Sequence, residues 1–184
     1  GLFVPTQQVG YYAGAERLTK ALLALFEPIN RTFLPRLSHL ARHNLSQAAR
    51  LAQLIVVSMG LLGLLFGGGV VLLAPLLVHL LLGPGFEPAI PLMRILALLL
   101  PLIAVNLALG LQWMVALGLD RAYTYITVGA GLLNIGVAIV LVPLFFQSGM
   151  AWAVVSAEAF VAMALVIHLH YSGKAPWQGG GIAR

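Results

Sequence analysis

Long apolar runs separated by short polar or turn-forming segments make up most of the chain. A helix needs about 20 mainly apolar residues to cross the hydrocarbon core of a bilayer. We expect five such helices, at residues 12–38, 51–82, 88–117, 122–142 and 149–171. The runs lack the two-residue alternation of a membrane β-barrel, so strands are not expected. The pattern predicts an all-α integral membrane helix bundle over residues 1–171.

The segments between the predicted helices are polar or contain turn residues. They read ARHNLSQAAR, GPGFEP, GLD and PLFFQS. The last segment, SGKAPWQGGGIAR at 172–184, has lost its apolar content, and we expect it to be a disordered tail. The chain begins with glycine and its first nine residues have no signal-peptide pattern, so we expect it to be part of a longer protein.

Composition agrees with a membrane protein. Of the 184 residues, 61% are hydrophobic and only 8% are charged, whereas soluble domains carry about 25% charged residues. The net charge of +5 fits the basic bias of cytoplasmic loops, so nucleic acid is not an expected partner. There is no cysteine, which excludes disulfides and thiolate metal sites.

Lysine and arginine alternate between the connecting segments. The basic residues that flank the spans on one side are Arg36, Arg42, Arg50, Arg121, Lys174 and Arg184. The segments after the second and fourth spans contain neither lysine nor arginine. Because basic loops stay in the cytoplasm, we expect a cytoplasmic C-terminus and an N-terminal end on the outer side.

Four charged residues lie within the first predicted span. Glu16, Lys20, Glu27 and Arg31 fall within about 60° of one another on a helical wheel and extend over about 22 Å. They form two acid-first pairs at i,i+4, the favourable order. Such a stripe would be very costly against lipid, so it indicates a polar lumen inside the bundle. The alternative is internal ion pairing that only positions helices.

Other polar residues in the spans are weaker candidates for the lumen. Arg17 lies off the stripe and lacks a partner in its own helix, which suits an anionic ligand. Arg94 either reaches the outer interface or points into the lumen. Asn30 flanks the stripe, and Tyr123, Thr127 and Asn134 form a second one, which equally suits helix–helix hydrogen bonding. We expect Glu158 to be a hydrogen-bonded structural carboxyl.

Motifs for packing are present, and motifs for enzymes are not. Gly63 and Gly67 form a GxxxG pattern, extended by Gly68 and Gly69, which indicates close helix packing or a hinge. Metal-protease and GxSxG motifs are missing. We therefore expect no enzyme activity, no cofactor and no metal.

Four stretches, in this order and spacing, resemble a known family. They are VGYYAGAERLTKAL, PINRTFLPRLSHL, LLGPGFEPAIPLMRILALLLPL and GLDRAYTYITVGAGLLNIGVAIVLVP. They are similar to the second half of bacterial polysaccharide flippases, the O-antigen and exopolysaccharide exporters, which share a superfamily with multidrug exporters. The resemblance implies a two-lobe transporter in the bacterial inner membrane. The five spans would then be the last five of twelve, and the N-terminal lobe of the same chain would be missing.

The resemblance also implies a substrate and a mechanism. The substrate would be an oligosaccharide on an undecaprenyl-type diphosphate lipid, flipped between leaflets by alternating access. Cations in a wet lumen suit the diphosphate, and Arg17, Lys20, Arg31 and Arg94 are available. Hydroxyl, amide and aromatic groups suit the sugar, and these are offered by Asn30, Tyr123, Thr127 and Asn134.

Two other functions compete with this one. A drug or cation exporter of the same superfamily would favour acidic lumen residues, but the acids of the stripe are paired with bases. A membrane-embedded glycosyltransferase or polymerase would need a catalytic acid or base in a large extramembrane loop. None of the segments between the predicted helices is long enough for such a loop.

Overall fold

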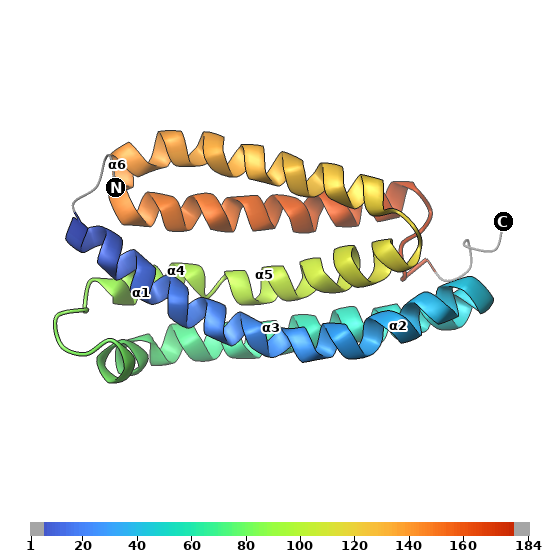
Figure 1. The fold of residues 1–184 in the computed structure, drawn as a ribbon, viewed down its shortest axis with the longest axis horizontal. Coiled ribbons are helices and arrows are strands. Elements are labelled where there is room, and N and C mark those ends of the chain that lie inside the picture. Colours follow the sequence, from blue (N-terminus) through green and yellow to red (C-terminus); the bar gives the residue numbers. More distant parts are fainter. Residues whose placement is uncertain (1–5, 179–184) are drawn as a thin grey trace.

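The apolar runs form helices that lie alongside one another in an elongated bundle (Figure 1). The computed structural model describes residues 6–178. The elements are α1 (Thr6–Leu23), η1 (Ala24–Phe26), α2 (Glu27–His43), α3 (Leu45–Leu81), α4 (Ala89–Leu96), α5 (Leu99–Asn106), η2 (Leu107–Met114) and α6 (Asp120–Tyr171). There is no strand in this part of the chain, so the predicted all-α class is confirmed.

Three stretches of the described chain are long and apolar enough to cross a membrane: Leu45–Leu81, Ala89–Met114 and Asp120–Tyr171. The second of these contains α4, α5 and η2 and corresponds to the predicted span 88–117. The predicted first span is not among the three, because α1 alone holds Glu16, Arg17 and Lys20 within 18 residues.

Helix α6 contains both of the last two predicted spans. Its backbone leaves the helical conformation at Phe146, where φ is 50° and ψ is −127°. The chain reverses direction there, and the two halves run side by side (Figure 1). Gly149 is buried just after the reversal, and a Cβ at this position would overlap the carbonyl of Leu141. The reversal lies within PLFFQS, where the sequence predicts a break between spans.

The path from α1 to α2 is interrupted close to Pro28. A short 3-10 turn, η1, separates the two helices, and Pro28 lies in the first turn of α2. Proline is tolerated there because the first N–H groups of a helix have no partner within the helix. The segment ARHNLSQAAR differs from expectation, since only Asn44 separates α2 from α3. The Asn44 side chain accepts a 3.0 Å hydrogen bond from the Gln47 N–H and caps α3.

Helix α3 packs closely against α4 and α5 through two glycines. A Cβ on Gly63 would lie 2.6 Å from the Pro101 Cα, and one on Gly67 would lie 2.9 Å from the Ala97 carbonyl oxygen. The GxxxG motif therefore forms a close helix contact, as predicted. Gly68 and Gly69 differ, since a Cβ on either would meet no atom within 4 Å.

Alanine should have opposite effects at Gly63 and Gly68. Gly63→Ala should lower the free energy of unfolding by about 1–3 kcal/mol, because the backbones of α3 and α5 must separate. Gly68→Ala should raise it by about 0.5–1 kcal/mol, because alanine is the better helix former and the space is open. Denaturation in mixed detergent micelles measures both. Changes of the same sign and size would contradict this packing.

The segment after α6 is packed where the sequence predicts disorder. Ala175 and Pro176 are buried, and the Pro176 carbonyl accepts a 2.7 Å hydrogen bond from Gln53 Nε2. The Lys174 carbonyl accepts one of 2.9 Å from Trp113 Nε1. Residues 172–178 are thus held by side chains of α3 and η2. The rest of the predicted tail, 179–184 with Arg184, lies outside the described residues.

Basic residues gather at one end of the bundle. The end of α2, the start of α3 and both ends of α6 lie together there (Figure 1). Arg42, Arg50, Arg121 and Lys174 lie at or beside these helix ends. The opposite end contains the start of α1, the turn between α3 and α4, and the reversal in α6. The lysines and arginines of alternate connecting segments therefore lie at the same end of the bundle. We call this end the basic end.

Candidate functional site

The predicted charged stripe forms on α1 and α2. Lys20 Nζ lies 2.9 Å from Glu16 Oε1, and the Arg31 guanidinium donates a 2.7 Å hydrogen bond to Glu27 Oε1. The Lys20 and Arg31 side chains are 69% and 79% exposed. Exposed pairs of this kind contribute at most about 1 kcal/mol to stability. The predicted ion pairs therefore form, but they stabilise the bundle too little to explain why the span contains four charges.

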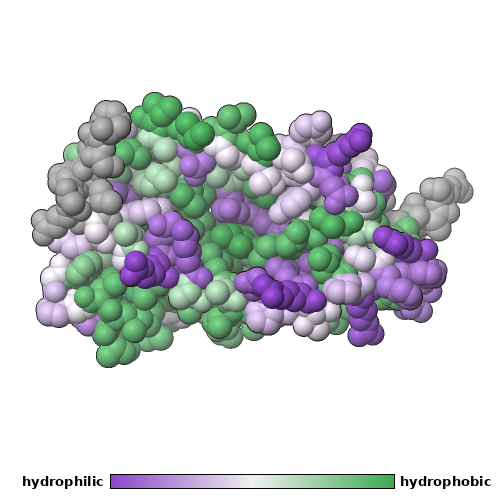
Figure 2. Space-filling model, in the orientation of Figure 1, coloured by the Kyte–Doolittle hydropathy of each residue, from purple (hydrophilic) through white to green (hydrophobic). Residues whose placement is uncertain are grey.

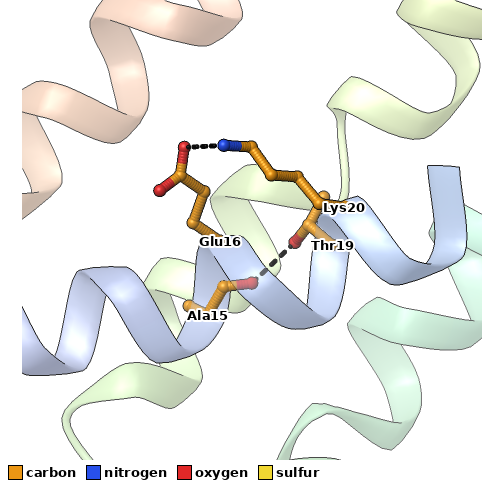
Figure 3. A network of polar contacts seen from close by, with 4 residues as sticks. All are labelled: Ala15, Glu16, Thr19 and Lys20. Atoms are coloured by element: carbon orange, nitrogen blue, oxygen red, sulfur yellow. Dashed lines mark hydrogen bonds and ion pairs between the residues drawn. The ribbon is translucent and has the colours of Figure 1, made fainter. Parts of the chain in front are cut away.

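Helix α1 has a buried side and a more exposed side. Ala15 and Thr19 are buried, and the Thr19 hydroxyl donates a 2.9 Å hydrogen bond to the Ala15 carbonyl within the helix. The Glu16 and Lys20 side chains extend from the helix and meet each other (Figure 3), and Lys20 is exposed. Hydrophilic side chains lie over α1 and α2 on the face seen in Figure 2. The stripe thus lies on an open face of the bundle.

Two of the predicted cations have no counterion. Arg17 on α1 and Arg94 on α4 are exposed, and neither has a hydrogen bond or ion pair to the rest of residues 6–178. The positive charges of Lys20 and Arg31 are partly neutralised by their acidic partners. Arg17 and Arg94 are therefore better placed to bind an anion.

The predicted stripe on α6 shows a mixture of environments. The half-buried Tyr123 ring lies directly against Gly110 of η2. The exposed Thr127 donates a 2.9 Å hydrogen bond to the Tyr123 carbonyl in its own helix. Asn134 is half-buried. In the described part of the chain, no hydrogen bond or ion pair connects these side chains to the charges of α1 and α2.

Asn30, predicted to face the lumen, is buried in a polar contact between helices. Its side-chain oxygen accepts a short hydrogen bond from Gln112 Nε2, and that nitrogen also lies 3.5 Å from the Met59 sulfur. Asn30 is 8% exposed and Gln112 is fully buried. In this structure Asn30 therefore connects α2 to η2 and does not line an open surface.

A second, partly buried contact connects Asn106, the last residue of α5, to α6. Asn106 Nδ2 donates hydrogen bonds of 2.7 Å to Glu158 Oε2 and 3.1 Å to the Glu158 carbonyl. The expected role of Glu158 as a hydrogen-bonded carboxyl matches this geometry. Asn106 is not among the residues predicted from the sequence. A lone amide in a long apolar run was the available signal, since such residues pair with one another in membranes.

Helix η2, which carries Gln112, is a stretch of π-helix. Its wider turns are rare and recur at functional positions in helices. The turns place the Gln112 amide against Asn30, while Gly110 allows Tyr123 to approach. Within the described residues, no group of three His, Asp or Glu side chains could hold a metal ion.

Comparison with known proteins finds a distant similarity. The chain is 27% identical over 159 residues to a protein of Escherichia coli (strain K12) named "Putative O-antigen transporter". The match covers 86% of this chain but 38% of that relative, so the chain spans well under half of the relative's length. No family model matches the chain. No solved structure matches it. The apolar helices and this similarity point to a membrane protein.

In a membrane protein, the open charged face of α1 and α2 constrains its surroundings. A charge at the centre of a bilayer costs several kcal/mol, at least about 2.5 on insertion scales. Glu16, Lys20, Glu27 and Arg31 are therefore expected to face water or further protein, not lipid tails. The charged face is therefore the candidate site.

Proposed function

We propose that this chain is the C-terminal part of a transporter that flips a lipid-linked oligosaccharide across the bacterial inner membrane for polysaccharide export. The observation that carries the proposal is the similarity to the Escherichia coli relative over 86% of the chain. The open charged face supports the proposal, because a passive membrane anchor does not require charged residues within a membrane-spanning segment.

The proposed topology has five membrane crossings, at the spans predicted from the sequence. The helical path through α1, η1 and α2 supplies the first, and the two halves of α6 supply the last two. The basic end lies in the cytoplasm in this topology, which follows from the positive-inside rule. The C-terminus is then cytoplasmic as well.

The proposed site divides its residues by chemistry. A lipid diphosphate is best held by charge-assisted hydrogen bonds, for which the candidates are Arg17, Lys20, Arg31 and Arg94. Arg17 and Arg94 come first because they have no counterion within residues 6–178. For the sugar we propose Tyr123, Thr127 and Asn134, with Asn30 available only if its contact with Gln112 opens.

The remainder of the transporter supplies the opposite wall of the lumen in this proposal. The chain corresponds to 38% of the length of its relative, which leaves room for a second lobe. Secondary transporters place the substrate between two repeats and alternate access by rocking one against the other. The charged face of α1 and α2 would then line the substrate path.

A reconstitution assay tests the proposed function. The complete protein in liposomes should move a fluorescent undecaprenyl-diphosphate oligosaccharide from one leaflet to the other, and should leave ethidium, a drug-like cation, at its passive rate. Ethidium transport without lipid flipping would replace the proposal with a multidrug exporter. Flipping is scored by the fraction of fluorophore that an impermeant reductant quenches.

Glu158 should tolerate conversion to an amide. In Glu158→Gln, an amide oxygen can still accept the Asn106 hydrogen bond, so flipping in the same assay should remain within about twofold, with its ion-gradient dependence unchanged. Glu158→Ala removes the acceptor and should lower the free energy of unfolding by about 0.6–1.7 kcal/mol. Loss of flipping in a normally expressed Glu158→Gln protein would show that the carboxylate itself is required.

A further inference from the structure

A cavity opens at the basic end, where three segments far apart in sequence meet. Its volume is about 670 Å³, within the usual range of ligand pockets. The lining comes from the junction of α2 and α3, the turn between η2 and α6, and the segment after α6. We call it the basic-end pocket. It is separate from the charged residues of α1 and the first turns of α2.

The charges lining the basic-end pocket are Arg42, Lys174 and Asp120, and their net charge is positive. All three are exposed, and none has an ion pair with any described residue. Two cations and a single acid, from separate elements, therefore line one cavity. An anion would balance the excess positive charge.

Lys174 is held in position by its backbone. Its carbonyl accepts a 2.9 Å hydrogen bond from Trp113 Nε1, and its N–H donates a 3.0 Å hydrogen bond to the Leu169 carbonyl. The Gln53 side chain holds the chain two residues further on, at Pro176. The ammonium group is thus carried by a fixed backbone, which lowers the entropy cost of binding.

Apolar side chains form part of the remaining lining. Ala41, Leu45, Val115, Ala116 and Leu117 contribute to the walls. Apolar walls add no binding free energy for a free inorganic anion. They do add binding free energy for an amphiphile whose anionic head is attached to apolar groups. The pocket also lies at the end of the apolar helices, which in a membrane would be at the level of the lipid headgroups.

We propose that the basic-end pocket binds the phosphodiester headgroup of an anionic phospholipid. Arg42 and Lys174 bind the phosphate, and the apolar walls contact the glycerol and the first methylenes. Basic pockets between helices on the cytoplasmic side are suited to such lipids. The inference rests on the proposed cytoplasmic position of the basic end, and it does not depend on the proposed oligosaccharide substrate.

Lipid titration of the complete protein, followed by native mass spectrometry, tests the proposal. The probes are phosphatidylglycerol and phosphatidylcholine with the same acyl chains. Arg42→Gln and Lys174→Gln should each weaken phosphatidylglycerol binding about fivefold and together about 30-fold, from about 1 kcal/mol per cation. Phosphatidylcholine binding should change less than about twofold.

Matched variants separate a site from general surface charge. Arg50→Gln removes an exposed cation at the same end that does not line the pocket, and should change phosphatidylglycerol binding less than twofold. Lys174→Arg should retain binding, and Asp120→Asn should strengthen it. Equal losses in Arg50→Gln and Lys174→Gln, or no loss in the double variant, would overturn the proposal.

A third arm uses inorganic phosphate alone. If the ligand is a lipid headgroup, millimolar phosphate should displace little bound phosphatidylglycerol, because it lacks the apolar contacts. Displacement at low phosphate concentration, lost in the Arg42→Gln, Lys174→Gln protein, would assign the pocket to a free phosphate and overturn the lipid assignment.

Discussion

The 184-residue chain, reconstituted without the proposed second lobe, is expected to flip lipid-linked oligosaccharide no faster than protein-free liposomes do. The physical reason is the open face of α1 and α2, where Lys20 and Arg31 are 69% and 79% exposed. Without an opposite wall these charges would meet lipid tails, which is costly. The measurement is the rate at which a fluorescent lipid-linked oligosaccharide becomes accessible to an impermeant reductant.

The matched control is the complete protein in the same liposomes at equal copy number. The isolated chain should also form oligomers or aggregates in detergent, visible by size-exclusion chromatography, because the same face is left uncovered. Flipping by the chain alone at the rate of the complete protein would show that the charged face needs no second lobe.

Removing the cations of α1 in the complete protein should strongly reduce polysaccharide display. We expect Arg17→Ala to lower surface polymer at least about tenfold, since a hydrogen bond to a charged group contributes about 1.5–3 kcal/mol. Lys20→Ala should have a smaller effect, because Glu16 already neutralises Lys20 at 2.9 Å. The double variant should approach the level of cells without the protein. Display is measured by immunoblotting of surface polysaccharide.

Arg36→Ala is the matched control for these variants. Arg36 is also an exposed cation, but it lies near the basic end of α2 and away from Arg17. Its removal should leave more than half of the polymer display. Normal display in both Arg17→Ala and Lys20→Ala cells, at normal protein levels, would remove these residues from the proposed diphosphate site.

Local features of the candidate site could be predicted from the sequence. The pairs Glu16–Lys20 and Glu27–Arg31 follow from i,i+4 spacing alone, because residues four apart are neighbours on any helix. The interruption before Pro28 also follows from local chemistry. Whether these charges contact a substrate is a separate question, which the mutations above address.

Contacts between distant segments could not be predicted in the same way. Asn30 and Gln112 are 82 residues apart, and Asn106 and Glu158 are 52 apart. The polar character of each residue was visible, but its partner depends on how the helices are arranged. The packing of residues 172–178 could not be predicted for the same reason. Side chains of α3 and η2, far away in the sequence, donate hydrogen bonds to carbonyls of this segment.

The sequence by itself determined the all-helical class, the break in α6 and the segregation of basic residues. Each of these depends on composition or on neighbours within a few residues. Only the tertiary structure decided that Gly63 and Gly67 meet the backbone of residues 97–101, while Gly68 and Gly69 face open space. Only the tertiary structure brought Arg42 and Lys174 to one pocket. The physical reason is that helix packing in a membrane depends on the fit between particular surfaces, which hydropathy and spacing do not specify.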